Sequence, residues 1–453
     1  MQSFALLPQA FERSRGDPVA QKISYKTSYT CKRRTPHLKE TPMAQRYPKI
    51  VFTEEVMREG MQIESASIPT EDKVRLLNAL SETGLQNIVV GSFVSPKYTP
   101  QMKRIEDVMI NFKPKEGVTY LAMIPNERGM ERARAFSPPL TLSRGRNLPR
   151  TSCHQCDVFT RRNYNRSQMK EMAGWAKTIA TAKAKGATEA GIGTNATFGS
   201  NFVGDFSVDV TMKFLEKQHE LWSAAGIKVT QVSVGDPMGW VHPLKIEQIF
   251  TRIKKQWPEV HDFRAHLHNA RGMAVAATNV AIRSLDENDS LRVEGTLGGI
   301  GGCPYCGTGQ ATGMMPTEDF MHMLDGMGIE TGVDMDKLIE CVWLLEEILG
   351  RQAWGHVSRA GPRPMKKERL FDANAPFVET IEQAKHFMYG PKLYEGGISP
   401  WTEKITSPYL ERLEKGQPMF ELDGNWPWQE SFFPKVEDVR SAIAETEQKE
   451  AAA

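Results

Sequence analysis

Residues 230–295 read TQVSVGDPMGWVHPLKIEQIFTRIKKQWPEVHDFRAHLHNARGMAVAATNVAIRSLDENDSLRVEG and contain the pattern that decides the fold. Three β-rich runs, Thr230–Val234, Phe263–His268 and Leu291–Gly295, are separated by two stretches with helical periodicity, Leu244–Lys255 and Gly272–Ser284. Strands that alternate with helices of this length build parallel sheets from β-α-β units. This part of the chain therefore predicts two successive strand–helix units followed by the strand of a third.

The same alternation continues toward the N-terminus. The helical stretch Glu71–Thr83 shows how its helices are built, because Thr70 can cap the start and Gly84 ends it. Eight β segments separated by helices predict an α/β fold, a single (β/α)₈ TIM barrel, with a doubly wound open sheet as the alternative. The five further β-rich runs are Lys49–Thr53, Asn87–Phe93, Val118–Ile124, Cys156–Phe159 and Ala190–Thr197.

Composition excludes several classes of protein. Hydrophobic residues make up 40% of the 453 positions, charged residues 25%, and the net charge is +2, which argues against a disordered chain or a polybasic nucleic-acid binder. No window approaches 18 uninterrupted apolar residues, so we expect no membrane partner. Six cysteines are too few for a disulfide-built secreted scaffold. We expect an intracellular enzyme in the cytoplasm.

The two ends differ from the middle and suggest three parts. We expect a leader over 1–45, the barrel over 46–345 and a C-terminal extension over 346–453. The first 42 residues carry eight basic side chains against three acidic ones, which is typical either of an unstructured tail or misassigned start, or of a transit peptide into the mitochondrial or another organelle matrix. The extension is rich in tryptophan, including Trp401, Trp426 and Trp428, so we expect it to pack as a lid or as the arm of a homo-oligomer.

In a TIM barrel the chemistry lies at the C-terminal ends of the strands. His266 and His268 stand two apart on a predicted strand, so both imidazoles can face the barrel axis and bind one ion. Glu59, after the first strand, adds a carboxylate, and Arg58 beside it can hold a substrate oxyanion. Such a mixed N/O site suits Mg²⁺, Mn²⁺, Fe²⁺ or Zn²⁺, whereas a buried polar pair of histidines is the alternative.

Four cysteines form two C-x-x-C motifs, Cys153/Cys156 and Cys303/Cys306. The gap of more than 140 residues between them is far longer than a zinc ribbon uses. Buried or adventitious thiols are therefore the favoured interpretation, and the alternatives are a structural zinc shared by the two motifs and a redox pair of Cys303 with Cys306.

Several long motifs follow one another between Tyr47 and Leu345. They are Arg58-Glu59-Gly60-Met61-Gln62, Gly84-Leu85, Ser92-Phe93-Val94-Ser95-Pro96-Lys97, Pro100-Gln101-Met102, Gly235-Asp236, His266-x-His268, Gly301-Gly302-Cys303-Pro304-Tyr305 and Thr317-Glu318-Asp319. Because these motifs are long and in register, the chain resembles the hydroxymethylglutaryl-CoA lyase family of metal-dependent barrel enzymes, which make or break carbon–carbon bonds.

The resemblance implies a divalent-metal lyase, with Mg²⁺ or Mn²⁺ favoured over Zn²⁺ or Fe²⁺, that splits a 3-hydroxy acyl-CoA into an acyl-CoA and a keto product. It implies that Glu59, His266 and His268 bind the metal. Arg58 would stabilise the enolate oxygen, and Cys303 would exchange the proton at the thioester carbon. The remaining implied site residues are Asp236 as a catalytic group and Gln62, Arg271, Gln310 and Met314 in contact with the substrate.

The metal and catalytic positions depart from the family pattern in three places. Glu59 replaces an aspartate, Val89 stands where the family carries a functional glutamate, and Met314 stands where the family has an asparagine ligand. A thioether is a poor ligand for a hard cation. The loop before Met314 is two residues longer than in the family, so Gln310 or Thr312 is a candidate to supply the lost oxygen.

The substrate side departs as well. Asn269-Ala270-Arg271 replaces an Asp-Thr-Tyr sequence, and the added Arg271 can meet a substrate carboxylate. Ile63-Glu64-Ser65-Ala66 differs from the family segment expected near the CoA end. We therefore expect an active lyase on a substrate other than hydroxymethylglutaryl-CoA itself. The alternatives are a related aldolase or condensing enzyme on a non-CoA substrate, or a non-catalytic binding protein that keeps the barrel.

Overall fold

The computed structural model describes residues 47–97, 99–142, 148–307, 313–364, 370–376, 397–399, 401–417 and 435–451. The predicted leader, Gln310 and Thr312 lie outside these ranges, as do Trp426 and Trp428 of the extension. The predictions made for those residues therefore stay predictions.

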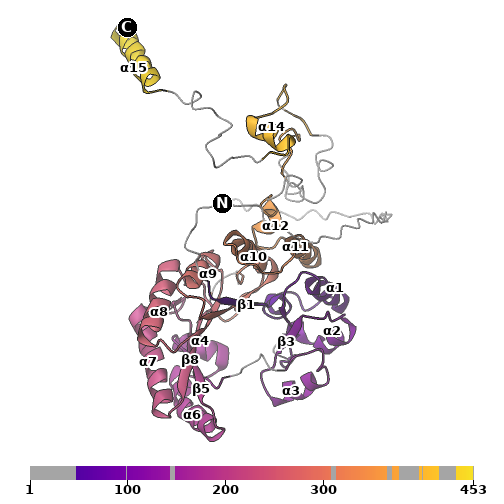
Figure 1. Ribbon diagram of the computed structural model, residues 1–453. Helices are drawn as coiled ribbons and strands as arrows, with labels where there is room; N and C mark the ends of the chain where they lie inside the picture. Colours follow the sequence, from indigo (N-terminus) through magenta and orange to yellow (C-terminus); the bar gives the residue numbers. More distant parts are fainter. Residues whose placement is uncertain are drawn as a thin grey trace, which may run out of the picture.

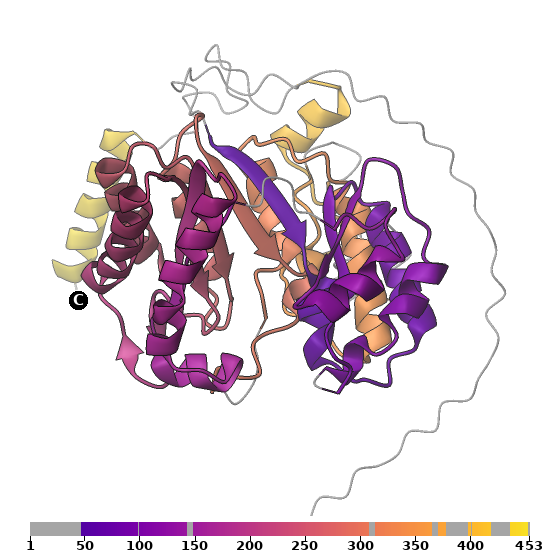
Figure 2. The same ribbon diagram turned by 90° about the horizontal axis from the view of Figure 1, so that it is seen from below.

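Eight parallel strands form one sheet in the order β3-β2-β1-β10-β9-β8-β5-β4 and alternate with helices, which is the predicted (β/α)₈ barrel. In Figure 2, β1 lies at the centre of the molecule, between the N-terminal strands and helices and the later ones. The strands of this sheet are β1 (Lys49–Glu54), β2 (Asn87–Ser92), β3 (Thr119–Met123), β4 (Cys153–His154), β5 (Glu189–Asn195), β8 (Lys228–Asp236), β9 (Asp262–Leu267) and β10 (Ser290–Gly295).

The pairing of β1 with β10 brings the first and last strands of the barrel together, from Lys49 opposite Ser290 to Glu54 opposite Gly295. β3 and β4 stand at the two ends of the strand order, and the chain segment that connects them pairs with a strand near each end. Leu140 pairs with Tyr120 of β3, whereas Arg150 pairs with Gly191 of β5.

The helices that alternate with the strands flank them on the outside. In Figure 1, α7 and α8 lie beside β5 and β8, and α1, α2 and α3 lie around β3. The helices are α1 (Thr70–Ser81), α2 (Ile105–Asn111), α3 (Glu127–Arg134), α4 (Asp157–Tyr164), α5 (Gln168–Ala173), α6 (Trp175–Ala184), α7 (Val208–Ala224), α8 (Pro243–Gln256), α9 (Ala274–Arg283), α10 (Thr317–Gly326), α11 (Met335–Leu349), α12 (Val357–Ala360), α14 (Pro408–Glu414) and α15 (Val436–Ala451).

Short elements complete the connections. They are the π-helix η1 (Val56–Gly60), the 3₁₀ turns η2 (Met61–Ile63), η3 (Pro100–Met102) and η4 (Leu297–Gly299), and a hairpin of β6 (Gly199–Ser200) and β7 (Gly204–Asp205).

Local sequence explains where several helices begin and end. The Ser207 side chain accepts the N–H of Val210 at the start of α7, and the Asp334 carboxylate accepts two N–H groups at the start of α11. Side-chain acceptors of this kind satisfy donors that the first helical turn leaves free. α11 ends at Gly350, whose φ of 65° is a left-handed conformation that glycine adopts without strain.

The predicted fourth strand, Cys156–Phe159, is wrong. β4 consists of Cys153 and His154, and α4 begins at Asp157. The thiol of Cys156 caps this helix by accepting the N–H of Phe159 at 3.4 Å. Asp157 in the first turn also favours a helix start, because its charge opposes the helix dipole. Phe159 is buried against Cys156, Ala196, Met238 and Cys306. A helical turn therefore buries the apolar side chains of this segment as well as a strand would.

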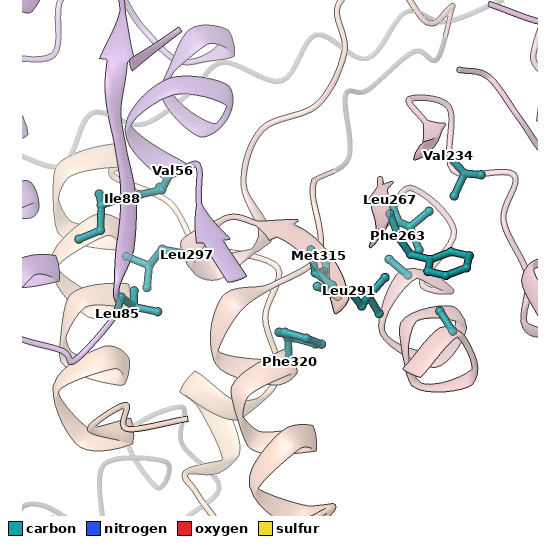
Figure 3. Packing of buried hydrophobic residues seen from close by; sticks show 14 of the residues in the cluster. Val56, Leu85, Ile88, Val234, Phe263, Leu267, Leu291, Leu297, Met315 and Phe320 are labelled. Carbon is teal, nitrogen blue, oxygen red and sulfur yellow. The ribbon is translucent and has the colours of Figure 1, made fainter. Parts of the chain in front are cut away.

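The core lies between the sheet and its helices. Figure 3 shows Phe263 and Leu267 of β9 lying next to Val234 of β8, and all three side chains are buried. Burying side chains of this size stabilises the fold by about 1.5–3 kcal/mol each. Val89, which stands where the family has a glutamate, is fully buried in β2.

Within the described part of the chain, no helix combines the length and apolar character needed to cross a bilayer.

Candidate metal centre and active site

The site is built where β1 and β9 end. Side chains alternate between the two faces of the sheet along β9, and His268 directly follows this strand, so His266 and His268 project on the same side. β1 runs into η1, in which the N–H groups of Glu59 and Gly60 both donate to the Glu55 carbonyl. This π-helical turn carries Arg58 and Glu59 at the barrel mouth, and such turns are frequent at functional sites.

Glu59, His266 and His268 converge, with one ligand atom from each lying within 4.8 Å of the others. Oε1 of Glu59 is 3.1 Å from Nε2 of His268, and Oε2 is 3.8 Å from Nε2 of His266. Burial opposes ionisation of Glu59, but the charges of Arg58 and His266 outweigh it and hold the pKa of this carboxyl well below its usual range. One anionic oxygen and two imidazole nitrogens form a donor set that suits a divalent cation.

A second carboxylate orients His266. Nδ1 of His266 lies 2.5 Å from Oε2 of Glu294, and Glu294 also pairs with Arg264. Burial lowers the pKa of His266, but Glu59 and Glu294 together raise it to about 10. A carboxylate on one ring nitrogen, with the other nitrogen facing the ion, is the usual outer arrangement of a metal-binding histidine.

Arg58 lies between two carboxylates. Its Nε donates to Glu55 at 2.9 Å, and one terminal nitrogen is 2.7 Å from Oε2 of Glu59. Although burial works against the charge, these acidic neighbours raise the pKa of Arg58, so the guanidinium stays cationic. Arg58 is therefore a fixed positive charge at the edge of the candidate metal centre.

Cys303 lies on the loop that follows β10 and is only partly buried. A hydrogen bond with Cys306 outweighs the effect of burial and lowers the pKa of Cys303. Gly301, two residues earlier on the same loop, packs against Glu59, since a Cβ on it would lie 2.9 Å from the Glu59 carbonyl oxygen, so this loop passes beside the candidate metal centre.

Asp236, predicted as a catalytic group, is fully buried at the end of β8. Its carboxylate accepts the N–H of Trp240 at 3.0 Å and that of Val241 at 2.7 Å. Burial raises its pKa above the ordinary value. These contacts hold the loop after β8, and Asp236 does not belong to the Glu59–His266–His268 group.

Arg271, predicted to bind substrate, ties neighbouring loops together. It donates to the Met238 carbonyl at 2.7 Å and to Asn201 at 3.1 Å, and its guanidinium lies 5.2 Å from the centre of the Trp240 ring. The side chain thus forms one wall of the barrel mouth, between the hairpin β6–β7 and the loop after β8.

The other two substrate candidates within the described residues differ in accessibility. Gln62 is half-buried on η2, directly after the turn that carries Glu59. Met314 is fully buried, and its backbone pairs with His268. A residue next to a candidate ligand thus offers a thioether where the family has an amide oxygen.

The structure brings together two cysteines of different motifs but forms no zinc site from them. Cys156 and Cys306 share one apolar cluster, yet Cys156 accepts a hydrogen bond from Ser200 and Cys306 donates to the Pro237 carbonyl. Among the described residues, the only group of three or more potential ligands is Glu59 with the two histidines.

Sequence analysis missed a histidine at the end of β4. His154 is buried, its Nδ1 lies 3.0 Å from Oε1 of Glu171, and its Nε2 has no hydrogen-bond partner. Its strand neighbour is Asn195 of β5. A histidine at the C-terminal end of a barrel strand is a candidate site residue. His154 was missed because the predicted fourth strand began three residues after the true start of β4.

It also missed a pair of buried acids beneath the glycine-rich loop. Glu54 accepts the N–H of Leu297 at 2.9 Å, and Glu318 accepts that of Gly298 at 2.9 Å. Burial raises the pKa of Glu54 to about 7 and that of Glu318 to about 8. Glu318 lies within the Thr317-Glu318-Asp319 motif, but nothing in the sequence shows that its side chain is buried.

Comparison with known proteins places this geometry in a family. The chain matches the HMGL-like family over residues 49–344. It is 32% identical to the hydroxymethylglutaryl-CoA lyase YngG of Bacillus subtilis over 307 residues, which is 67% of this chain and 95% of that protein. It is 29% identical to a 3-hydroxy-3-isohexenylglutaryl-CoA/hydroxymethylglutaryl-CoA lyase of Pseudomonas aeruginosa, over 69% of this chain and 97% of that protein.

A solved structure agrees with these relatives. An HMG-CoA lyase from Acinetobacter baumannii, in complex with coenzyme A and 3-methylmalate, superposes with a TM-score of 0.54 and 26% identity over 72% of this chain and 98% of that one. The family match covers more than half of the chain and includes η1, β9 and the Cys303 loop. The chain therefore belongs to the hydroxymethylglutaryl-CoA lyase-like family, as a divergent member, and is a carbon–carbon lyase.

Proposed function

We propose that this lyase cleaves a 3-hydroxy acyl-CoA, in a divalent-metal-dependent reaction, into an acyl-CoA and a keto product. The observation that carries the proposal is the convergence of Glu59, His266 and His268 beside Arg58 and near Cys303. Mg²⁺ or Mn²⁺ is the favoured ion. When bound, such an ion supplies a positive charge that polarises a substrate oxygen and eases its deprotonation.

The protein groups around that centre have distinct tasks. Arg58 is held by Glu55 and Glu59 and cannot lose its proton, so it stabilises the negative oxygen of the enolate as the carbon–carbon bond breaks. Glu294 keeps His266 turned with Nε2 toward Glu59. These fixed charges need no rearrangement during the reaction.

Cys303 is the proton donor to the thioester carbon. Its position on the loop after β10 leaves it partly accessible, and its lowered pKa makes it exchange a proton more readily than an ordinary thiol. Asp236, Arg271, Gln62 and Met314 complete the proposed site, with Arg271 as the partner of an added carboxylate on the substrate.

Two relatives support a CoA thioester with a variable acyl chain. The Acinetobacter baumannii structure contains coenzyme A with 3-methylmalate, and the Pseudomonas aeruginosa enzyme is named for a longer isohexenyl substrate as well. Where the family has a glutamate and an asparagine, this chain has the apolar and fully buried side chains of Val89 and Met314. We infer that the acyl group is more apolar than that of hydroxymethylglutaryl-CoA.

A second candidate is aldolase chemistry on a substrate without CoA. The segment Ile63-Glu64-Ser65-Ala66, expected near the CoA end, differs in sequence from the family and is held by contacts of Glu64. Glu64 pairs with Arg351, beyond α11, and its carbonyl accepts the Gln101 side chain at 3.1 Å. These two contacts of Glu64 are the observation in favour of the second candidate, because they tie the segment expected near the CoA end to other parts of the chain.

The decisive experiment incubates purified full-length protein and Mn²⁺ or Mg²⁺ with hydroxymethylglutaryl-CoA, with 3-hydroxy analogues carrying longer acyl chains, and with the CoA-free 3-hydroxy acids. The formation of acyl-CoA and keto products is followed by mass spectrometry. His268→Gln tests the metal centre, and His261→Gln is the matched control, because His261 is exposed and precedes the opposite end of the same strand. Cleavage of only CoA-free acids would support the second candidate, and no cleavage with no bound metal would refute both.

We also propose a homo-oligomer and action in the cytoplasm, with the mitochondrial matrix as the alternative compartment. Light scattering of the full chain tests the first statement. Localisation of a tagged full-length protein tests the second.

A further inference from the structure

Two cysteines of the loop after β10 lie at the ends of one tight turn. The N–H of Cys306 donates to the Cys303 carbonyl at 3.3 Å, which closes a turn of four residues through Pro304 and Tyr305. The α-carbons at the ends of such a turn are less than about 7 Å apart, and a disulfide spans about 4.4–6.8 Å. The backbone therefore already holds both residues at disulfide distance.

The two thiols face the same apolar cluster but differ in accessibility. Cys306 is only 2% exposed, whereas Cys303 is partly accessible and packs against the cluster from outside. Cys306 donates its S–H to the Pro237 carbonyl at 3.0 Å, which fixes its sulfur in the core. An accessible thiol next to a buried one is the arrangement of an attacking and a resolving cysteine.

The pKa values of the two thiols also differ, and the more accessible thiol has the lower one. The interaction with Cys306 lowers the pKa of Cys303, whereas the interaction with Cys303 and burial raise that of Cys306, so Cys303 is the first of the two thiols to lose its proton. The thiolate is the form that reacts with oxidants, whereas a buried neutral thiol is inert until a partner sulfur becomes electrophilic.

We propose that Cys303 and Cys306 form a modification site for hydroperoxides, at which a reversible disulfide closes the turn. The Cys303 thiolate attacks the outer peroxide oxygen, the O–O bond breaks, and an alcohol or water leaves as Cys303 becomes a sulfenic acid. The Cys306 sulfur then attacks the Cys303 sulfur and water leaves. In total, two thiols and one hydroperoxide give one disulfide, one alcohol or water, and one further water. Two equivalents of an external thiol reverse the change and are themselves oxidised to a disulfide.

The chemistry has a consequence for the active site. A disulfide removes the sulfur-bound proton that Cys303 delivers in the proposed reaction, so oxidation stops turnover while the loop stays closed. This consequence rests on the proposed function, whereas disulfide formation itself does not.

The test uses the full-length reduced protein and hydrogen peroxide as the probe. After exposure, the protein is alkylated under denaturing conditions and digested, and the peptide that contains both residues is weighed. We expect it to lose two hydrogens and to accept no alkyl groups, while Cys153, Cys156 and Cys341 remain fully alkylated. Dithiothreitol restores two alkylation sites, and lyase activity falls at least tenfold with peroxide and returns with dithiothreitol.

Two variants assign the roles. In Cys306→Ser, a dimedone adduct accumulates on Cys303, because no resolving sulfur is present. In Cys303→Ser, neither adduct nor disulfide forms at Cys306. Cys156→Ser is the matched control, since Cys156 shares the cluster with Cys306 and is equally buried, and it should leave the 303–306 disulfide unchanged. Thermal melting confirms that each variant is folded.

The proposal is overturned if both cysteines remain alkylatable after excess peroxide, or if Cys306 pairs with Cys156 instead. It is also overturned if dimedone marks Cys306 in Cys303→Ser. A protein that forms the disulfide but cleaves no substrate in its reduced state refutes the proposed function alone. Conversely, an active protein whose cysteines do not pair refutes the redox site alone.

Discussion

Oε2 of Glu294 lies 2.5 Å from Nδ1 of His266 and turns the opposite nitrogen of the ring toward Glu59. The two residues stand on neighbouring strands, β10 and β9, whose parallel pairing begins at Ser290 opposite Asp262. A carboxylate in this position sets the orientation of a candidate ligand without contacting the ion itself.

Replacing Glu294 by glutamine should weaken metal binding by about 10–100-fold, because the ring loses its anionic partner. Titration calorimetry with Mn²⁺ measures the effect. Glu259→Gln is the matched control, since Glu259 also pairs with a histidine, His219, at 3.1 Å, but away from the site. Equal affinities in the two variants would show that Glu294 does not orient a metal ligand.

Met314→Asn should restore an oxygen donor next to His268 and strengthen Mg²⁺ binding by at least about tenfold, since hard cations prefer oxygen to a thioether. Met314→Leu controls for the change at a buried position, as it removes the sulfur without adding an oxygen. If the asparagine and leucine variants bind Mg²⁺ alike, position 314 does not reach the ion.

Stability should depend on pH through Glu318. Its pKa is raised from 4.5 to about 8 by burial, so the folded state holds a proton that the unfolded chain has lost. That contribution is complete below about pH 4.5 and is lost as the pH rises toward 8, by roughly 3 kcal/mol between pH 5 and 8. Urea unfolding at both pH values measures the loss, and Glu318→Gln should reduce it by most of that amount. An unchanged pH dependence would place the titration elsewhere.

The buried pair of Glu171 and His154 should matter more to stability than a similar surface pair. Both side chains are about 5% exposed, so Glu171→Ala leaves buried groups without their partner and should cost about 3 kcal/mol or more. Glu259→Ala removes the more exposed partner of His219 and should cost less than about 1 kcal/mol. Equal losses of unfolding free energy in the two variants would contradict this difference.

Much of the barrel is predictable from the sequence, because each of its longer strands is a β-rich run bounded by a turn. β9, with His266 on it and His268 directly after it, follows from this pattern, since alternation along a strand fixes which side chains share a face. β4 does not, because it has only two residues and precedes an apolar segment that a capping cysteine turns into a helix.

The site was predictable in its ligands but not in their surroundings. Glu59, His266 and His268 carry ligand groups at strand ends, so their residue types point to the centre. Glu294 and Glu171 act through contacts with side chains on other elements, and those contacts depend on register and helix placement that no short motif records. The contacts of Asp236 with backbone N–H groups, and of Arg271 with the Met238 carbonyl and the Asn201 side chain, are likewise recorded by no motif, and the roles predicted for both residues stay predictions.

Because the pKa of His266 is raised to about 10, this candidate metal ligand carries a proton at neutral pH when no ion is bound. A cation that takes the Nε2 lone pair must displace this proton, so each ion that binds at neutral pH sends one proton into the solvent. Apparent affinity then rises by about tenfold for every pH unit up to 10. Acidification of the surrounding compartment would therefore weaken metal binding, because protons compete for the same ring nitrogen.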